Sequence, residues 1–280
     1  MKRIRVTAVS SRCARHFVLL LLVSTVADCS HPTTRSERLT FTGRQVTVIN
    51  ARGNIYAYAP AFGDLSNEFT LTEATQQPNA VQTAVATDSK TITVCARKRL
   101  RDMYGDEAWP FFYKILSTEK ARARLCDRPP SAAVDYTVRV PKQAHLSLFT
   151  ANGSIHATDV AQPVDARVRT GEIKIQIPSY ANAATEEGNI TVLFGDAQWP
   201  GTLHFSTERG DIELWVPATA DADVNLHTDH GTIFTDFNLR GTSSGDTETI
   251  AGSIGRGGNR KVDVHVTNGS IRMLKLTPQM

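Results

Sequence analysis

The acidic residues Glu172 and Asp211 occupy equivalent positions in two copies of a Gly-x-Ile tripeptide, and paired acids are what glycoside hydrolysis needs. If each copy forms one layer of a stacked structure, these two acids are two layers, or roughly 10 Å, apart. The acids of inverting glycosidases are closer, at about 6.5–9.5 Å. Asn189 occupies the position in the copy between them, and several other copies have serine or threonine there. Such variation is typical of a solvated turn, so we predict no catalytic residue.

Histidines are the other side chains that could do chemistry, as metal ligands. His227 and His265 share a repeat position but are expected two layers apart, and the remaining histidines are scattered along the chain. Ligation requires donor atoms about 2.0–2.1 Å from a single ion. The sequence has no His-x-His, Cys-x-x-Cys or His-Glu-x-x-His spacing, and the glycine-rich stretch 255–258 lacks the lysine and following helix of a phosphate loop. We therefore predict no metal site and no cofactor.

Aromatic and basic residues are better candidates for binding. Alternation predicts that Trp215 points outward, where its ring could stack on a sugar, although solitary exposed apolar residues are also ordinary. Residues 97–125 interleave basic and aromatic side chains and end in a helix-prone stretch. This segment is interpreted either as a cap on the fold or as an arm that binds phosphates, glycans or a membrane surface. The candidate binding residues are Trp215, Trp109, Arg97, Lys98 and Arg99.

These residues must be positioned by a repeated element, because Gly-x-Ile occurs eight times, mostly at intervals of about 20 residues. A unit this short cannot bury its own apolar face, so successive copies are expected to stack. Glycine suits a turn with positive φ, and the isoleucine two residues later would form a buried ladder. The residues assigned to this repeat are Gly153, Ile155, Gly171, Ile173, Gly188, Ile190, Gly210, Ile212, Gly231, Ile233, Gly269 and Ile271; further copies begin at Gly53 and Gly252.

Strands are expected on both sides of each glycine, because apolar and polar residues alternate there with a period of two. Residues 171–178 and 210–217 show this alternation clearly, and prolines mark the far ends of several strands. The prediction is an all-β fold, a parallel β-solenoid over residues 42–278, with a small, partly helical insertion at 97–125. A β-sandwich built from hairpins predicts the same alternation, but it gives no reason for isoleucine to follow each glycine at the same distance.

The chain resembles a family of bacterial exported, adhesin-like domains of unknown function. The resemblance rests on threonine-initiated glycine turns and a late Ile-Gly-x-Gly-Gly element, found at Thr150–Ile155, Thr207–Ile212, Ile254–Gly258 and Thr267–Ile271. It extends roughly from residue 45 to residue 277 and is strongest after residue 135. Membership would imply a β-helix-like fold on the cell exterior, and the adhesin label is itself an analogy of fold.

Residues 1–28 are interpreted as an export signal, because a basic start precedes an apolar segment too short to span a bilayer. The segment has five basic residues and one acid, so its removal changes the formal net charge from +3 to −1. No general affinity for nucleic acid is expected at that charge. The polar residues 29–41 would then form a tether, and the protein would reside in the periplasm or at the cell surface.

The cysteines add two expectations about the envelope. Cys29 directly follows the signal and resembles the lipid-accepting cysteine of bacterial lipoproteins, although Asp28 stands where that signal has a small residue. A lipid at Cys29 would be the chain's sole link to a membrane; the alternative is soluble release. Cys95 and Cys126 flank the insertion and are a natural disulfide pair in an oxidising compartment.

Together these observations favour a non-enzymatic envelope protein that serves as an adhesin-like binding or scaffold module. Its partner is not specified by the sequence, and an envelope glycan or protein suits the compartment. The alternative is a polysaccharide-active enzyme on a β-helix, a glycoside hydrolase or lyase. That alternative would require Glu172, Asp211 and Glu213 to line one groove beside Trp215.

Overall fold

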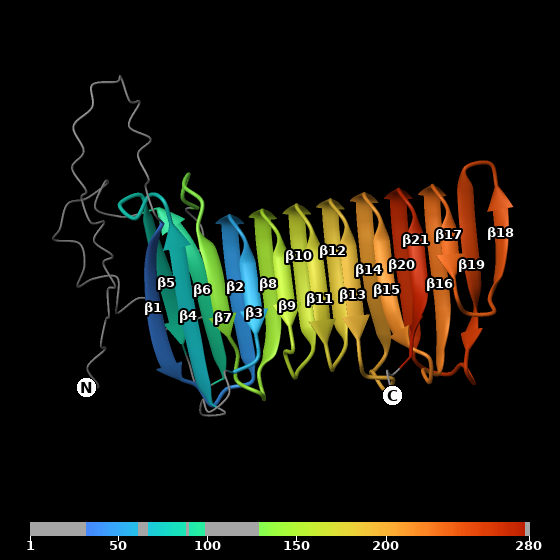
Figure 1. Ribbon diagram of the computed structural model, residues 1–280, viewed down its shortest axis with the longest axis horizontal. Coiled ribbons are helices and arrows are strands. Elements are labelled where there is room, and N and C mark those ends of the chain that lie inside the picture. Colours follow the sequence, from blue (N-terminus) through green and yellow to red (C-terminus); the bar gives the residue numbers. More distant parts are fainter. Residues whose placement is uncertain (1–31, 61–66, 88–89, 99–128, 278–280) are drawn as a thin grey trace, which may run out of the picture.

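The computed structural model describes residues 32–60, 67–87, 90–98 and 129–277. All regular elements within these ranges are strands, and the strands form two long sheets that face each other along one axis (Figure 1). The all-β prediction is confirmed. The helix expected in the insertion falls in a part of the chain outside the described residues.

The ten-stranded sheet consists mainly of the strands that follow the turns. In spatial order its members are β1 (Thr33–Thr40), β4 (Glu68–Thr75), β7 (Asp135–Arg139), β3 (Ile55–Tyr58), β9 (Ile155–Thr158), β11 (Ile173–Ile177), β13 (Ile190–Phe194), β15 (Ile212–Pro217), β21 (Ile271–Leu276) and β17 (Ile233–Thr235).

The eleven-stranded sheet consists mainly of the strands that precede the turns. In spatial order its members are β18 (Arg240–Ser244), β19 (Thr247–Ile254), β16 (Ala222–His230), β20 (Lys261–Asn268), β14 (Thr202–Arg209), β12 (Ala181–Glu187), β10 (Val164–Thr170), β8 (His145–Asn152), β2 (Gln45–Arg52), β6 (Thr91–Lys98) and β5 (Val81–Thr87).

One rung of the fold is a strand in each sheet joined by a glycine turn. Rungs stack in parallel and in register, so that Ile173 pairs with Ile155 on one side and with Ile190 on the other. The strands preceding the turn keep the same order, β8, β10, β12 and β14. A sandwich of hairpins would pair sequential strands antiparallel. The parallel ladders therefore confirm the β-solenoid.

Glycine is required at the turn by both conformation and space. Gly171 has a φ of +143°, which L side chains rarely adopt. A Cβ added there would also overlap the carbonyl oxygen of Gly153 in the rung before it. The same overlap recurs from rung to rung, so the backbones of consecutive turns approach too closely for any side chain.

Two ladders of side-chain hydrogen bonds join consecutive turns. In the first, a buried threonine donates to a glycine carbonyl of a neighbouring rung, as Thr207 Oγ1 does to Gly188 at 3.1 Å. In the second, the residue after the glycine accepts from the adjacent backbone, as Asn189 Oδ1 does from the Asp211 N–H at 2.9 Å. Asp211 Oδ1 accepts in turn from the Ser270 N–H at 2.8 Å. These bonds satisfy turn groups that the sheet ladders leave unpaired.

The core is a single apolar column between the two sheets. The turn isoleucines Ile155, Ile173, Ile190, Ile212 and Ile271 are all fully buried. Each such side chain contributes about 1.5–3 kcal/mol by leaving water. The predicted isoleucine ladder is confirmed.

The order of the rungs departs from the order of the sequence at both ends. At the C-terminal end, β20 and β21 lie between the β14/β15 rung and the β16/β17 rung. At the N-terminal end, β2 and β3 lie between β6/β7 and β8/β9. The prediction that each copy stacks on the next copy in the sequence was therefore wrong at both ends. At each end, a rung from elsewhere in the sequence lies between two rungs that are consecutive in the chain (Figure 1).

Antiparallel strands cover both ends of the solenoid. β4 and β1 extend the ten-stranded sheet, β5 extends the other sheet at the same end, and β19 and β18 form a hairpin at the opposite end. Gly252 lies inside β19, so the Gly252–Ile254 tripeptide is not a rung turn as the spacing had indicated. These additions protect β7, β6 and β16 from edge-to-edge association, whereas β17 remains an edge of the ten-stranded sheet.

Two predicted boundaries need correction. Residues 33–40 of the expected tether form β1, which pairs along its whole length with β4. Arg97 and Lys98 belong to β6 and not to an insertion. β6 and β7 are the two strands of one rung, and the rest of the predicted insertion lies between them in the sequence. The predicted export signal and the rest of the predicted insertion lie outside the described residues.

Candidate functional site

The acids considered for catalysis have structural partners. Glu172 Oε2 pairs with Lys174 Nζ at 2.6 Å, and this contact lowers the pKa of the Glu172 carboxyl. A carboxyl held in its ionised form is poorly suited to act as a general acid. Asp211 belongs to the hydrogen-bonded turn ladder described above. The register places Glu172 and Asp211 two rungs apart, as predicted.

The outer face of the ten-stranded sheet gathers aromatic side chains into two neighbouring rows. In the first row, the ring of Tyr56 stacks on His156 with centroids 5.3 Å apart and 17° between the planes. Burial, and then the charge of Lys174 on the next strand, lower the pKa of His156. At the far end of this row, Phe234 is 55% exposed and is the one largely exposed large apolar side chain among the described residues.

The second row has Tyr58 and Trp215, four strands apart in the sheet. The Arg139 guanidinium lies over the Tyr58 ring, 5.8 Å from its centroid. The Trp215 indole N–H donates to Glu213 Oε1 at 2.8 Å, and its register neighbours are Leu193 and Leu274. Trp215 is thus outward, as predicted, but only half-exposed, because an apolar stripe surrounds it.

The other predicted binding residues are not brought together with Trp215. Arg97 and Lys98 lie on β6, in the opposite sheet and toward the opposite end. Arg99 and Trp109 lie outside the described residues. Their role in binding stays a prediction.

The cysteine predictions fall partly outside the described chain. Cys95 is fully buried on β6, next to Ala86. Cys126 and Cys29 lie beyond the described ranges, so the disulfide and the lipid anchor stay predictions. Within the described part of the chain, no helix has the length and hydropathy that a membrane span requires.

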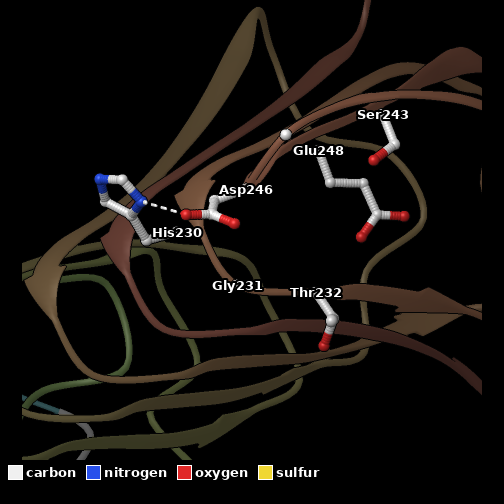
Figure 2. A pocket seen from close by; sticks show the side chains of 7 residues that line it. His230, Gly231, Thr232, Ser243, Asp246 and Glu248 are labelled. Atoms are coloured by element: carbon white, nitrogen blue, oxygen red, sulfur yellow. Dashed lines mark ion pairs between the residues drawn. The ribbon is translucent and has the colours of Figure 1, made fainter.

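A polar depression lies at the end of the solenoid formed by the β16/β17 rung, between the turn of that rung and the β18–β19 hairpin (Figure 2). Its side chains have structural partners. Glu248 Oε2 accepts from the Ile233 N–H at 2.8 Å, and His230 Nδ1 lies 3.7 Å from Asp246 Oδ2. In the neighbouring rung the equivalent N–H, that of Ile271, donates to the Thr232 carbonyl. The Glu248 carboxylate therefore takes the place of the carbonyl that a further rung would offer to the Ile233 N–H. The depression is part of the structure that closes this end of the solenoid.

The histidines correct a prediction. His227 and His265 were expected two rungs apart, but β20 pairs directly with β16 and places them opposite each other. Their ring centroids are 5.2 Å apart, and both rings approach Asp229. Sequence reasoning missed this cluster because it assumed that the rungs follow chain order.

Comparison with known families agrees with this architecture. The profile of the Toastrack DUF4097 domain matches residues 131–273, just over half of the chain. The chain belongs to the Toastrack DUF4097 family. The function of this domain is not known, and the match spans β7 through the first half of β21.

Two solved structures resemble this Toastrack chain. One is described as a "putative cell adhesion protein" from Clostridium sporogenes, with 8% identity and a TM-score of 0.45, covering 88% of this chain and 100% of that one. The other is described as a "putative adhesin" from Bacteroides fragilis, with 12% identity and a TM-score of 0.37, covering 86% and 97%. No curated protein matches the chain.

Proposed function

We propose that this Toastrack protein is an exported, non-enzymatic module of the cell envelope that binds an extended glycan along the outer face of its ten-stranded sheet. The observation that carries the proposal is the pair of aromatic rows on that face, with Tyr56, Tyr58 and His156 toward one end and Trp215 and Phe234 toward the other.

The spacing of these side chains suits a long ligand. Tyr58 and Trp215 are separated by four strand spacings, roughly 19 Å. Aromatic rings bind the apolar faces of sugars, while polar neighbours bind the hydroxyl groups. Lys174, Gln176 and Thr191 occupy the strands between the two aromatic ends and offer such groups.

The fold also supports binding by its rigidity. Tyr56, Tyr58, His156 and Trp215 project from strands that have parallel neighbours on both sides. The hydrogen bonds between consecutive turns hold these strands further. A preformed face loses little conformational entropy when a ligand binds. Export rests on the sequence of residues 1–28, and attachment to a membrane would rest on a lipid at Cys29. The enzymatic alternative has no comparable support, since Glu172 and Asp211 are engaged in the turns.

The test is the binding of the purified mature protein to a glycan array and to envelope fractions. Trp215→Ala and the double variant Tyr56→Ala, Tyr58→Ala should each weaken glycan binding about tenfold or more. Phe149→Ala is the matched control, because Phe149 is a half-buried aromatic on the outer face of the other sheet. Equal binding by all three variants would overturn the proposal. Binding confined to envelope proteins would replace the glycan by a protein partner.

A further inference from the structure

Three side chains with metal-binding chemistry meet on the outer face of the eleven-stranded sheet. His227 and Asp229 are two residues apart on β16 and therefore point to the same face. His265 lies on β20, directly opposite His227 in the parallel register. The cluster forms because β20 lies between β14 and β16, where its outer face is next to His227.

The donor atoms of the three side chains lie close together. His227 Nε2 lies 3.0 Å from Asp229 Oδ1, and His265 Nε2 lies 3.4 Å from Asp229 Oδ2. One donor atom from each residue can be chosen so that all three lie within 4.8 Å of one another. Ligands bound tetrahedrally at about 2.0–2.1 Å from an ion are separated from each other by about 3.3–3.4 Å. These two separations, one to each carboxylate oxygen of Asp229, are close to that value. Small side-chain rotations would therefore place one donor atom from each residue around a single ion.

A fourth residue orients the first ligand. His227 Nδ1 lies 2.8 Å from Thr249 Oγ1 on β19, the antiparallel neighbour of β16. A hydrogen bond from Nδ1–H to this hydroxyl leaves Nε2 with a free lone pair directed at the cluster. Histidine ligands in metal sites commonly have such an outer partner, which fixes the tautomer and the plane of the ring. Thr249 is thus a positioning residue.

The cluster is open on one side. His227 and Asp229 are half-buried, whereas His265 is exposed and borders a shallow depression whose lining includes Ala184 and Ser206 on the neighbouring strands. Ala184 and Ser206 have small side chains, so water or another small ligand can approach His265 from this side. Two imidazoles with one carboxylate favour zinc, copper, nickel or iron over magnesium and calcium, which prefer oxygen ligands.

From this arrangement we propose that His227, Asp229 and His265 bind one divalent transition-metal ion, with Thr249 as the positioning residue. The ligands come from β16 and β20, and their orienting partner comes from β19. The ion would therefore connect β20 to its neighbour β16, and Thr249 would connect His227 to the β18–β19 hairpin. This site is separate from the face proposed to bind glycan, which lies on the other sheet.

The test is a titration of the mature protein, without a histidine tag, with Zn²⁺ by calorimetry, and with Co²⁺ by visible absorption. We expect one Zn²⁺ per chain, and His227→Ala and His265→Ala should each weaken binding about 100-fold. The matched control is His204→Ala, because His204 lies on the same face, 3.6 Å from Asp263. This variant should bind Zn²⁺ as the unmodified protein does. All three side chains point outward, so circular dichroism should show unchanged folds.

Thr249 supplies the second arm of the test. Thr249→Val should weaken Zn²⁺ binding about tenfold and alter the Co²⁺ absorption spectrum, and Thr249→Ser should restore both. The proposal is overturned if the unmodified protein binds no Zn²⁺ at micromolar concentrations. It is equally overturned if His204→Ala weakens binding as much as His265→Ala does.

Discussion

The central rungs, from β8/β9 to β14/β15, and the rungs at the two ends are built from the same turn but assembled differently. In the centre each rung follows its predecessor in the sequence, and turn side chains such as Thr207 and Asn189 bond to a neighbouring rung. At the ends a later rung is inserted beside an earlier one, and antiparallel strands complete the sheets. The regular stack therefore supplies rigidity, whereas insertion brings distant residues such as His227 and His265 together.

The largest expected difference between these regions concerns the isoleucine ladder. Ile212→Asp should unfold the protein or cost about 4 kcal/mol or more, because an unpaired charge would be enclosed between rungs on both sides. Ile233→Asp is the matched variant, in a three-residue strand at the sheet edge with 9% of its surface exposed. Its charge can reach water after local fraying, so the loss should be smaller. Chemical denaturation measures both losses, and equal values would contradict the distinction between centre and end.

The turn glycines should show the next largest difference. Gly171→Ala should cost about 3 kcal/mol or more, because the added Cβ meets the Gly153 carbonyl and the φ of +143° is unfavourable. Gly245→Ala is the control in the β18–β19 hairpin, where φ is +63° and no atom lies near the added carbon. Only the conformational cost of about 1–2 kcal/mol applies there. Thermal melting of both variants checks the contrast, and a Gly171→Ala protein as stable as Gly245→Ala would refute the close approach of the turns.

The same contrast explains how far the sequence could predict this structure. The glycine at 210 and the isoleucine at 212 are local signals, because one turn dictates both residue types. The order of the rungs is not local. Strands β16 and β20 have the same apolar alternation, so the pattern does not decide which of them pairs with β14. That choice places His265 beside His227, and no spacing rule could have found the cluster.

The N-terminal end illustrates a different obstacle. Val134, Asp135 and Tyr136 form a rung turn without glycine or isoleucine, recognisable only because Tyr136 pairs with Ile55 and Asp135 accepts from the Asn54 N–H. The aromatic rows were partly predictable, since alternation identified Trp215 as outward. The stacking of Tyr56 on His156 depends on β3 pairing with β9 across a long excursion of the chain. Local patterns cannot supply that information.

The smallest effect concerns a histidine–acid pair in the regular stack, a counterpart to the cluster at the inserted end. Asp165 Oδ2 lies 2.9 Å from His145 Nε2, and Asp165 Oδ1 accepts from Asn182 Nδ2 at 2.8 Å. The hydrogen bond with His145, followed by the bond from Asn182, lowers the pKa of Asp165 despite partial burial. Asp165 has one histidine and one amide as partners, whereas Asp229 has two histidines. The Asp165 group should therefore contribute stability and not metal binding.

A carboxyl whose pKa is lower in the folded protein binds fewer protons there than in the unfolded chain. Its contribution to stability is therefore present at neutral pH and disappears as the pH falls through the folded pKa, below about pH 4. Asp165→Asn should lower stability at pH 7 by less than about 1 kcal/mol, because the pair is more than one-third exposed. The difference from the unmodified protein should shrink toward pH 3. Denaturation at the two pH values measures this change, and an equal deficit at both would show that Asp165 acts through packing and not through its charge.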